Sequence, residues 1–333
     1  MVLTKGVIYD VTDAVHPRLL CHTTGTLVHL FTGDTFTYVR PSGGSTQVIL
    51  HSMGSGNESI VATFPLDMYA SWGGYLAYTA DGSAAANVTQ DNPDAEIHVW
   101  LASQRGVAEI RHFPVPLADC ICRFGLPPQT LSFSPDGQYL VSGWPVGKGA
   151  VPLEVRRVSD DALMIDINVD YNVSLWAPNG HRLYVTGTPG SATWTPEGGL
   201  APIPGAPQWV LVPSLSPNGE QVAYTNYTDV AQPSSLRVYV HDFGSQQTWV
   251  LVNSLRSDVF FVKDGWVWYG EEVACDPKGT YPGCGEWGTA PSGKTFAMNL
   301  ATGVETAVVM PAVENSAGWW QLEWSTPEFW PNT

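Results

Sequence analysis

Short apolar stretches with period-two alternation recur along the chain, and tight-turn residues separate them. Residues 131–144 place Ser-Pro-Asp-Gly between two such stretches, and residues 174–187 and 214–226 repeat the arrangement with Pro-Asn-Gly. Proline presets φ for the first corner of a turn, and Asp or Asn followed by Gly accepts positive φ. Alternation on both sides gives each strand two distinct faces. The pattern therefore predicts a series of β-hairpins.

Weaker copies extend the series at 262–268, 71–78 and 30–36. The predicted turn glycines are Gly33, Gly74, Gly137, Gly180, Gly219 and Gly265. One long interval contains an insertion at about 114–128, and without it the period is about 45 residues, the length of a four-stranded propeller blade. A second pair of alternating strands follows each hairpin, for example 97–100 with 108–111.

The hairpin motif at this period resembles the repeats of TolB-type and WD-like β-propellers, although the Trp-Asp ending of true WD repeats is absent. The resemblance covers nearly the whole chain and implies an all-β fold, a single β-propeller domain over 1–333. Blades are expected at about 26–64, 67–113, 129–168, 170–205, 208–253 and 258–310. Strands in 7–21 and 319–325 would pair into a seventh, closing blade, which hides both sheet edges. Six blades with free ends is the alternative.

Composition and charge limit the partners. Only 14% of the residues are charged, and 31 acids against 15 bases give a formal charge of −16. Phosphate backbones and anionic membranes are bound by basic surfaces, so neither nucleic acid nor a membrane is an expected partner. No run of 18 apolar residues occurs, so no membrane insertion by this chain is expected. A monomer is expected.

The fold resemblance places the long, unequal loops on the face opposite the hairpin turns, where binding residues commonly lie. These loops are expected at 79–95, 143–152, 225–235 and 270–293. Asp67, Asp170 and Asp258 stand at the starts of inner strands, where their carboxylates would converge on Ca²⁺ or another divalent metal. The alternative is that each Asp is a turn residue bound to its own backbone. No cofactor is certain. The loop acids Glu271 and Glu272 are expected in a solvated rim.

Aromatic and histidine residues supply the other candidates. Four aromatic residues are expected on loops, where they would contact a ligand: Trp144, Trp194, Tyr281 and Trp287. His29 lies on an expected inner strand and, with Asp170, is a weak catalytic candidate; a packed core histidine is the alternative. The sequence contains neither a Gly-x-Ser-x-Gly nucleophile motif nor a phosphate-binding loop.

Five cysteines occur, at 21, 120, 122, 275 and 284. Cys275 and Cys284 share one Gly/Pro-rich loop, and a disulfide between them is the natural interpretation for an exported protein. The partners of Cys21, Cys120 and Cys122 stay open. The chain is expected outside the cell or in the periplasm, with its export signal or anchor outside the given sequence; a cytoplasmic protein is the alternative.

Two functions from different classes fit the sequence. The first is a binding or scaffold propeller that holds a protein or carbohydrate ligand on its acidic, aromatic long-loop face. The second is a metal-dependent hydrolase, similar to the propeller lactonases and phosphotriesterases, with its site in the central channel. A domain of a larger protein, such as a membrane-anchored receptor, is a third interpretation.

Overall fold

The structure is a computed structural model of the 333-residue chain, and it contains β-strands and one short 3₁₀ helix in its described part. The described residues are 2–4, 7–22, 28–30, 35–64, 76–79, 82–90, 96–114, 130–143, 153–167, 171–177, 181–187, 190–206, 211–229, 232–275 and 289–309. The chain divides into two compact units. We call Gly25–Ile203 the middle unit, and Met1–Thr24 together with Pro204–Thr333 the terminal unit.

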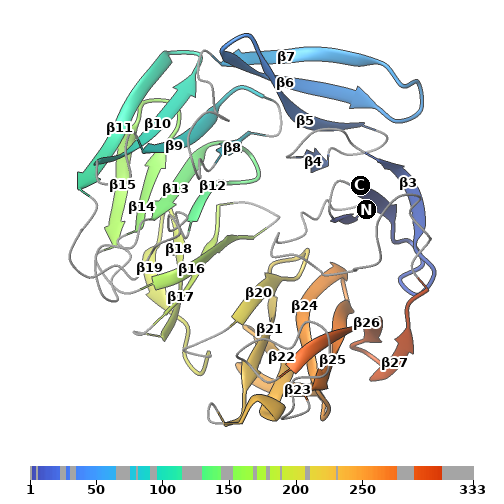
Figure 1. Cartoon of the computed structure of the whole chain (residues 1–333). Helices are drawn as coiled ribbons and strands as arrows, with labels where there is room; N and C mark the ends of the chain where they lie inside the picture. The colour runs from blue at the N-terminus through green and yellow to red at the C-terminus, as the bar shows by residue number, and fades with distance from the viewer. Residues whose placement is uncertain are drawn as a thin grey trace. The chain divides into compact units, whose positions relative to one another are not determined.

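The middle unit holds four four-stranded antiparallel sheets, each with its strands in chain order (Figure 1). The first two sheets are β4 (Val28–Leu30), β5 (Thr35–Ser42), β6 (Ser45–Ser52) and β7 (Glu58–Phe64), then β8 (Leu76–Tyr78), β9 (Ala85–Gln90), β10 (Glu96–Ser103) and β11 (Gly106–Pro114). The next two are β12 (Thr130–Phe133), β13 (Tyr139–Gly143), β14 (Leu153–Arg157) and β15 (Ala162–Ile167), then β16 (Tyr171–Trp176), β17 (Leu183–Gly187), β18 (Gly190–Thr195) and β19 (Gly199–Pro202).

The terminal unit holds two further four-stranded sheets and one sheet of three described strands. The three-stranded sheet is β1 (Val2–Thr4), β2 (Val7–Asp10) and β3 (Arg18–His22). The others are β20 (Leu211–Leu215), β21 (Gln221–Tyr227), β22 (Leu236–Asp242) and β23 (Gln247–Val252), with helix η1 (Pro233–Ser235), and β24 (Arg256–Lys263), β25 (Trp266–Ala274), β26 (Thr289–Asn299) and β27 (Val304–Ala307).

The predicted all-β fold is confirmed, and the described residues form seven sheets that match the seven expected blades in number and in chain position. Strand β1 adds to the expected outer pair in 7–21. The expected closing strand at 319–325 lies outside the described residues, so closure of a ring stays a prediction. Among the described residues, no helix combines the length and the apolar character that crossing a bilayer requires.

Hairpin turns pack against the preceding sheet in the middle unit. Gly82 has φ +68°, and a Cβ there would lie 2.8 Å from Cγ2 of Val61. Gly137, in the predicted Pro-Asp-Gly turn, has φ +71°, and its Cβ would lie 2.7 Å from Cγ2 of Thr79. Both positions require glycine for its backbone conformation and for the close approach. Asp136, in the same turn, binds His181 of the following hairpin.

The hairpin turn predicted at Gly74 is wrong, because the structure places this turn eight residues later, at Gly82. Leu76–Tyr78 forms the first strand of its sheet, and the turn that follows passes through Gly82. Strand β9 (Ala85–Gln90) therefore occupies part of the expected loop 79–95. The local reason is that Ala84, Ala85 and Ala86 are small enough to be buried between neighbouring strands, although they lack the bulky apolar pattern typical of a strand.

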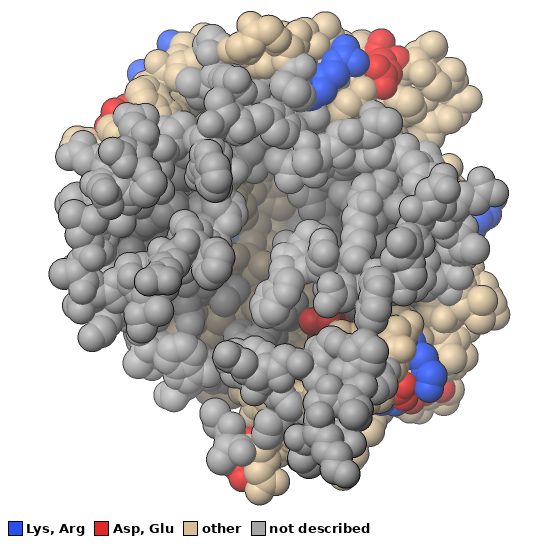
Figure 2. Space-filling view, viewed as in Figure 1, with Lys and Arg blue, Asp and Glu red and all other residues tan. Residues whose placement is uncertain are grey.

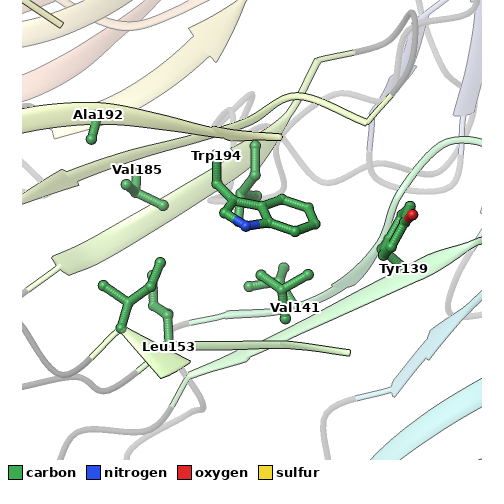
Figure 3. Packing of buried hydrophobic residues seen from close by; sticks show 9 residues of the cluster. Tyr139, Val141, Leu153, Val185, Ala192 and Trp194 are labelled. Carbon is green, nitrogen blue, oxygen red and sulfur yellow. The ribbon is translucent and has the colours of Figure 1, made fainter. Parts of the chain in front are cut away.

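The cores lie between successive sheets. In the middle unit, Tyr139, Val141 and Leu153 of one sheet pack against Val185 and Trp194 of the next (Figure 3). In the terminal unit, Tyr9, Val11 and Ala14 pack against the β24–β27 sheet, and that sheet packs on its other side against Ala223, Val238 and Val240. Inner strands such as β13 and β17 are thus buried along their whole length, as stacked sheets require.

Candidate functional site at the loop end of the terminal unit

Two neighbouring sheets of the terminal unit are aligned by their hairpin turns. The backbone N–H of Asn218, between β20 and β21, donates a 3.2 Å hydrogen bond to Oδ1 of Asp264, between β24 and β25. The opposite ends of these strands carry Tyr227, Ser257, Asp258 and Glu272. We call these four residues the loop end. Asp258 therefore lies near the end of β24 that is opposite its hairpin turn.

Asp258 sits on an irregularity of its strand. The pairing of β24 with β25 shifts register between Ser257 and Phe260, so β24 carries one extra residue there. Asp258 has φ +53°, in the left-handed region that residues other than glycine rarely adopt. Such bulges re-aim side chains and are common beside functional sites. This strained position is the feature that most distinguishes Asp258 from the ordinary strand residues around it.

The carboxyl group of Asp258 is largely removed from water. Burial, with a smaller contribution from the charge of the nearby Glu272 carboxylate, raises its pKa to about 6, although a hydrogen bond with Ser257 acts in the opposite direction. Ser257 also uses its hydroxyl to donate a 2.6 Å hydrogen bond to Oε1 of Glu272. A carboxyl group with this pKa exchanges a proton near neutral pH or pairs with a cation, and such groups concentrate at functional sites.

Tyr227 extends the group to the neighbouring sheet. Burial raises the pKa of its phenol, and the charge of Glu272 raises it further. The charge of Glu272 therefore raises the pKa of Asp258 and that of Tyr227, which belong to different sheets. The loop end thus combines two carboxyl groups, a serine hydroxyl and an aromatic ring.

A charged network lies directly beside the loop end. Arg256 places Nη2 3.2 Å from Oε1 of Glu305 and Nη1 3.8 Å from Oε1 of Glu271, with its guanidinium over the Phe296 ring. Lys294 Nζ lies 3.1 Å from Oε2 of Glu271. The solvated rim predicted for Glu271 is wrong, because its side chain is only 21% exposed and is held by two cations. Arg256 and Lys294 therefore form their ion pairs with Glu271 and Glu305.

The structure tests only some of the other candidates. Trp194 is buried, 2% exposed, in strand β18, so its predicted position on a loop is wrong. Its indole packs edge-on against Tyr139 of the preceding sheet (Figure 3). His29 lies in β4, the first strand of its sheet, as predicted; its side chain lies outside the described part. Asp67, Trp144, Asp170, Tyr281 and Trp287 also lie outside the described residues.

The described residues include one member of the predicted metal triad and one cysteine of the predicted disulfide. Within the described ranges, no three His, Cys, Asp or Glu residues are arranged to hold a metal ion. Asp258 is the one member of the predicted metal triad in those ranges. Cys275, which directly follows β25, is disulfide-bonded. Its predicted partner, Cys284, lies outside them.

Sequence reasoning missed Ser257 and Tyr227. Each stands where a strand meets a long loop, which is a weak signal by itself. The contact of Ser257 with Glu272 depends on the β24–β25 register and its extra residue, and these are not visible in the sequence. Figure 2 shows acidic and basic side chains in neighbouring positions on the described part of one face.

No protein-family model and no curated protein sequence matches the chain. Solved structures do match. TolB from Acinetobacter baumannii is 13% identical over 71% of this chain and 57% of its own, with a TM-score of 0.40. The β-propeller domain of the Trilobed protease from Pyrococcus furiosus is 9% identical over 87% of this chain and 85% of its own, with a TM-score of 0.48.

A prolyl endopeptidase is 13% identical over 87% of this chain, with a TM-score of 0.50. The chain spans 57% of the TolB chain and 44% of the endopeptidase chain. At the level of fold, the protein resembles TolB and other β-propeller domains. At these identities the likeness concerns the fold alone, because one propeller architecture carries many unrelated functions.

Proposed function

We propose that the protein is a binding β-propeller that holds a protein or carbohydrate ligand at the loop end of the terminal unit. The observation that carries this proposal is Asp258: a half-buried carboxyl group on a left-handed, bulged backbone. A strained residue other than glycine and a desolvated carboxyl group both lower the stability of the fold. Such costs are typical of positions that are retained for function.

The surroundings of Asp258 suit a binding role. Strands β24 and β25 hold Ser257, Asp258 and Glu272, and a site built on strands is more rigid than one built on loops. Tyr227 adds an aromatic face, which supplies contact area together with a polar hydroxyl. The predicted ligand contacts of Tyr281 and Trp287 remain part of the proposal, whereas that of Trp144, which belongs to the middle unit, stays a separate prediction. Trp194 is not part of the proposal, because it belongs to a core.

Matched variants test this proposal. Wild type, Asp258→Asn and Asp264→Asn are screened against a glycan panel and a peptide library, followed by titration calorimetry on the hits. Asp264 is the control because it lies at the opposite ends of β24 and β25. We expect a ligand whose affinity falls at least about tenfold in Asp258→Asn and is unchanged in Asp264→Asn. If every ligand found binds Asp258→Asn as tightly as wild type, the proposal is wrong.

The second candidate function is a metal-dependent hydrolase with Asp67, Asp170 and Asp258 as ligands. The observation in its favour is that the charge of Glu272 raises the pKa of Asp258, so two oxygen donors on neighbouring strands lie within electrostatic reach of each other. Oxygen donors suit Ca²⁺ and Mg²⁺. Metal analysis of the purified protein, with lactone and aryl-ester assays, tests it. Stoichiometric metal that is lost together with turnover in Asp170→Ala supports the hydrolase; no metal and no turnover contradict it.

We also propose that the protein works in an oxidising compartment, outside the cell or in the periplasm. The disulfide at Cys275 supports this location, because structural disulfides persist mainly in exported proteins. Peptide mapping under non-reducing conditions tests the proposed Cys275–Cys284 pairing. A peptide that joins these two cysteines supports it, and a peptide that joins Cys275 to Cys21, Cys120 or Cys122 contradicts it.

A further inference from the structure

The two carboxyl groups of the loop end have no cationic partner within the described residues. Neither Asp258 nor Glu272 takes part in an ion pair there. The bases beside them are engaged elsewhere: Arg256 with Glu271 and Glu305, and Lys294 with Glu271. Carboxylates withdrawn from water are normally paired with a positive charge, because desolvation of an unpaired charge is costly.

A buried hydroxyl on the neighbouring strand gives an independent observation. Thr225 is 2% exposed, and its Oγ1 has no hydrogen-bond partner among the described residues. Thr225 stands two residues before Tyr227 on β21, so the two side chains share a face. Ala223 lies on that face too and packs in one core with Val259 and Phe261 of β24. The face is therefore turned toward β24, and the Thr225 side chain, with a hydroxyl that can donate and accept, lies on this face.

We propose that the loop end binds a cationic side chain of a protein partner, an ammonium or guanidinium group, between the carboxylates of Asp258 and Glu272. This inference rests on the proposed binding function and names the chemistry of its ligand. The Ser257 hydroxyl fixes one oxygen of Glu272 and leaves its other oxygen available to a donor. Thr225 supplies an uncharged acceptor, and the ring of Tyr227 attracts a cation to its face.

Charge favours a cation over the other ligand classes. The formal charge of −16 attracts basic partners over a distance and raises their association rate. An anionic ligand would meet two carboxylates of like sign. A neutral oligosaccharide would leave the charge of both carboxylates uncompensated. A partner with a lysine or arginine on an exposed turn satisfies the site best.

The probes are blocked tripeptides: glycyl-lysyl-glycine, its Nζ-acetylated form and glycyl-glutamyl-glycine. Titration calorimetry at low salt compares wild type, Asp258→Asn, Glu272→Gln, Thr225→Val and the control Asp264→Asn. We expect only the free lysine peptide to bind, with a loss of about tenfold or more in Asp258→Asn and Glu272→Gln. Thr225→Val should weaken binding by a few-fold, and Asp264→Asn should match wild type. Unfolding curves verify that each variant is folded.

Proton release gives a second measurement. The pKa of Asp258 is about 6, so at pH 6 a bound cation should displace part of a proton. The measured enthalpy should therefore vary with the ionisation enthalpy of the buffer in wild type and not in Asp258→Asn. A structural role of Asp258 alone would produce no such difference.

Four outcomes overturn the inference. Equal binding of the free and acetylated lysine peptides shows that the charge is not recognised. Lysine-peptide binding that is unchanged in both Asp258→Asn and Glu272→Gln places any cation site elsewhere. If a neutral glycan binds in an Asp258-dependent manner while the lysine peptide does not, the proposed binding function stands and the cationic ligand is wrong. If no ligand of any class depends on Asp258, both proposals fail.

Discussion

The indole nitrogen of Trp268 donates a 2.8 Å hydrogen bond to the backbone carbonyl of Ala14, which lies 254 residues earlier in the chain. Lys263 Nζ donates a 2.7 Å bond to the carbonyl of Thr12 close by. Together with the buried contacts of Tyr9 and Val11, these bonds hold the N-terminal sheet against the β24–β27 sheet. The residues near the N-terminus are therefore part of the core that supports the loop end.

Trp268→Phe should destabilise the protein. The ring would still fill most of the buried volume, but the carbonyl of Ala14 would lose its donor in a buried position. We expect the free energy of unfolding to fall by about 1–3 kcal/mol in urea titrations. Tyr9→Phe is the control, because the buried Tyr9 hydroxyl has no hydrogen-bond partner in the described part of the chain. Its removal should leave stability unchanged or slightly higher, and a larger loss in the control than in Trp268→Phe would contradict this account.

Glu154→Gln should remove a buried charge that serves two arginines. Glu154 is 8% exposed and lies 3.3 Å from Nε of Arg111 and 3.1 Å from Nε of Arg156. Loss of a carboxylate from a buried pair costs at most about 3 kcal/mol here, because Arg156 keeps its ion pair with Asp161. Glu197→Gln, at an exposed position, should change stability by less than about 0.5 kcal/mol. Similar values for the two variants would show that the Glu154 pairs contribute little.

His241 should make stability depend on pH. It is fully buried, and burial lowers its pKa, so the folded protein holds it neutral. The unfolded chain takes up a proton near pH 6.5 and the folded protein does not. The stability from this group is therefore present above that pH and is lost as the pH falls toward the folded pKa. In unfolding titrations from pH 8 to 5, His241→Gln should lose less stability than wild type; parallel curves would contradict this.

The sequence predicts most of the sheet framework, because turn chemistry is local. Gly137 and Gly219, in two of the strongest copies of the hairpin motif, lie in turns with positive φ. The weak copy at 71–78 was misplaced because Gly73 and Gly74 resemble a turn as strongly as Asp81 and Gly82 do. The choice between them depends on Val61 of the preceding sheet, against which Gly82 packs.

The candidate site was only partly predictable. Asp258 could be found from its position at the start of an inner strand. Its bulge and its interaction with Glu272 depend on the register of β24 and β25. Trp194 was predicted incorrectly for a different reason. A tryptophan in a Gly- and Thr-rich stretch suggests an exposed loop, but contact with Tyr139 of another sheet buries it.

The central claim is that Asp258 is retained for function at a cost in stability, and the free energy of unfolding of Asp258→Asn tests it most directly. The pKa of Asp258 rises from 3.8 to about 6 on folding, so its ionisation disfavours the folded state as the pH rises through that range. Asparagine removes this cost and tolerates the left-handed backbone. Urea titrations at pH 8 should find the variant more stable than wild type by about 2 kcal/mol, with the difference shrinking toward pH 4. A variant less stable than wild type at pH 8 would show that the surroundings stabilise the ionised carboxylate, and would contradict the account.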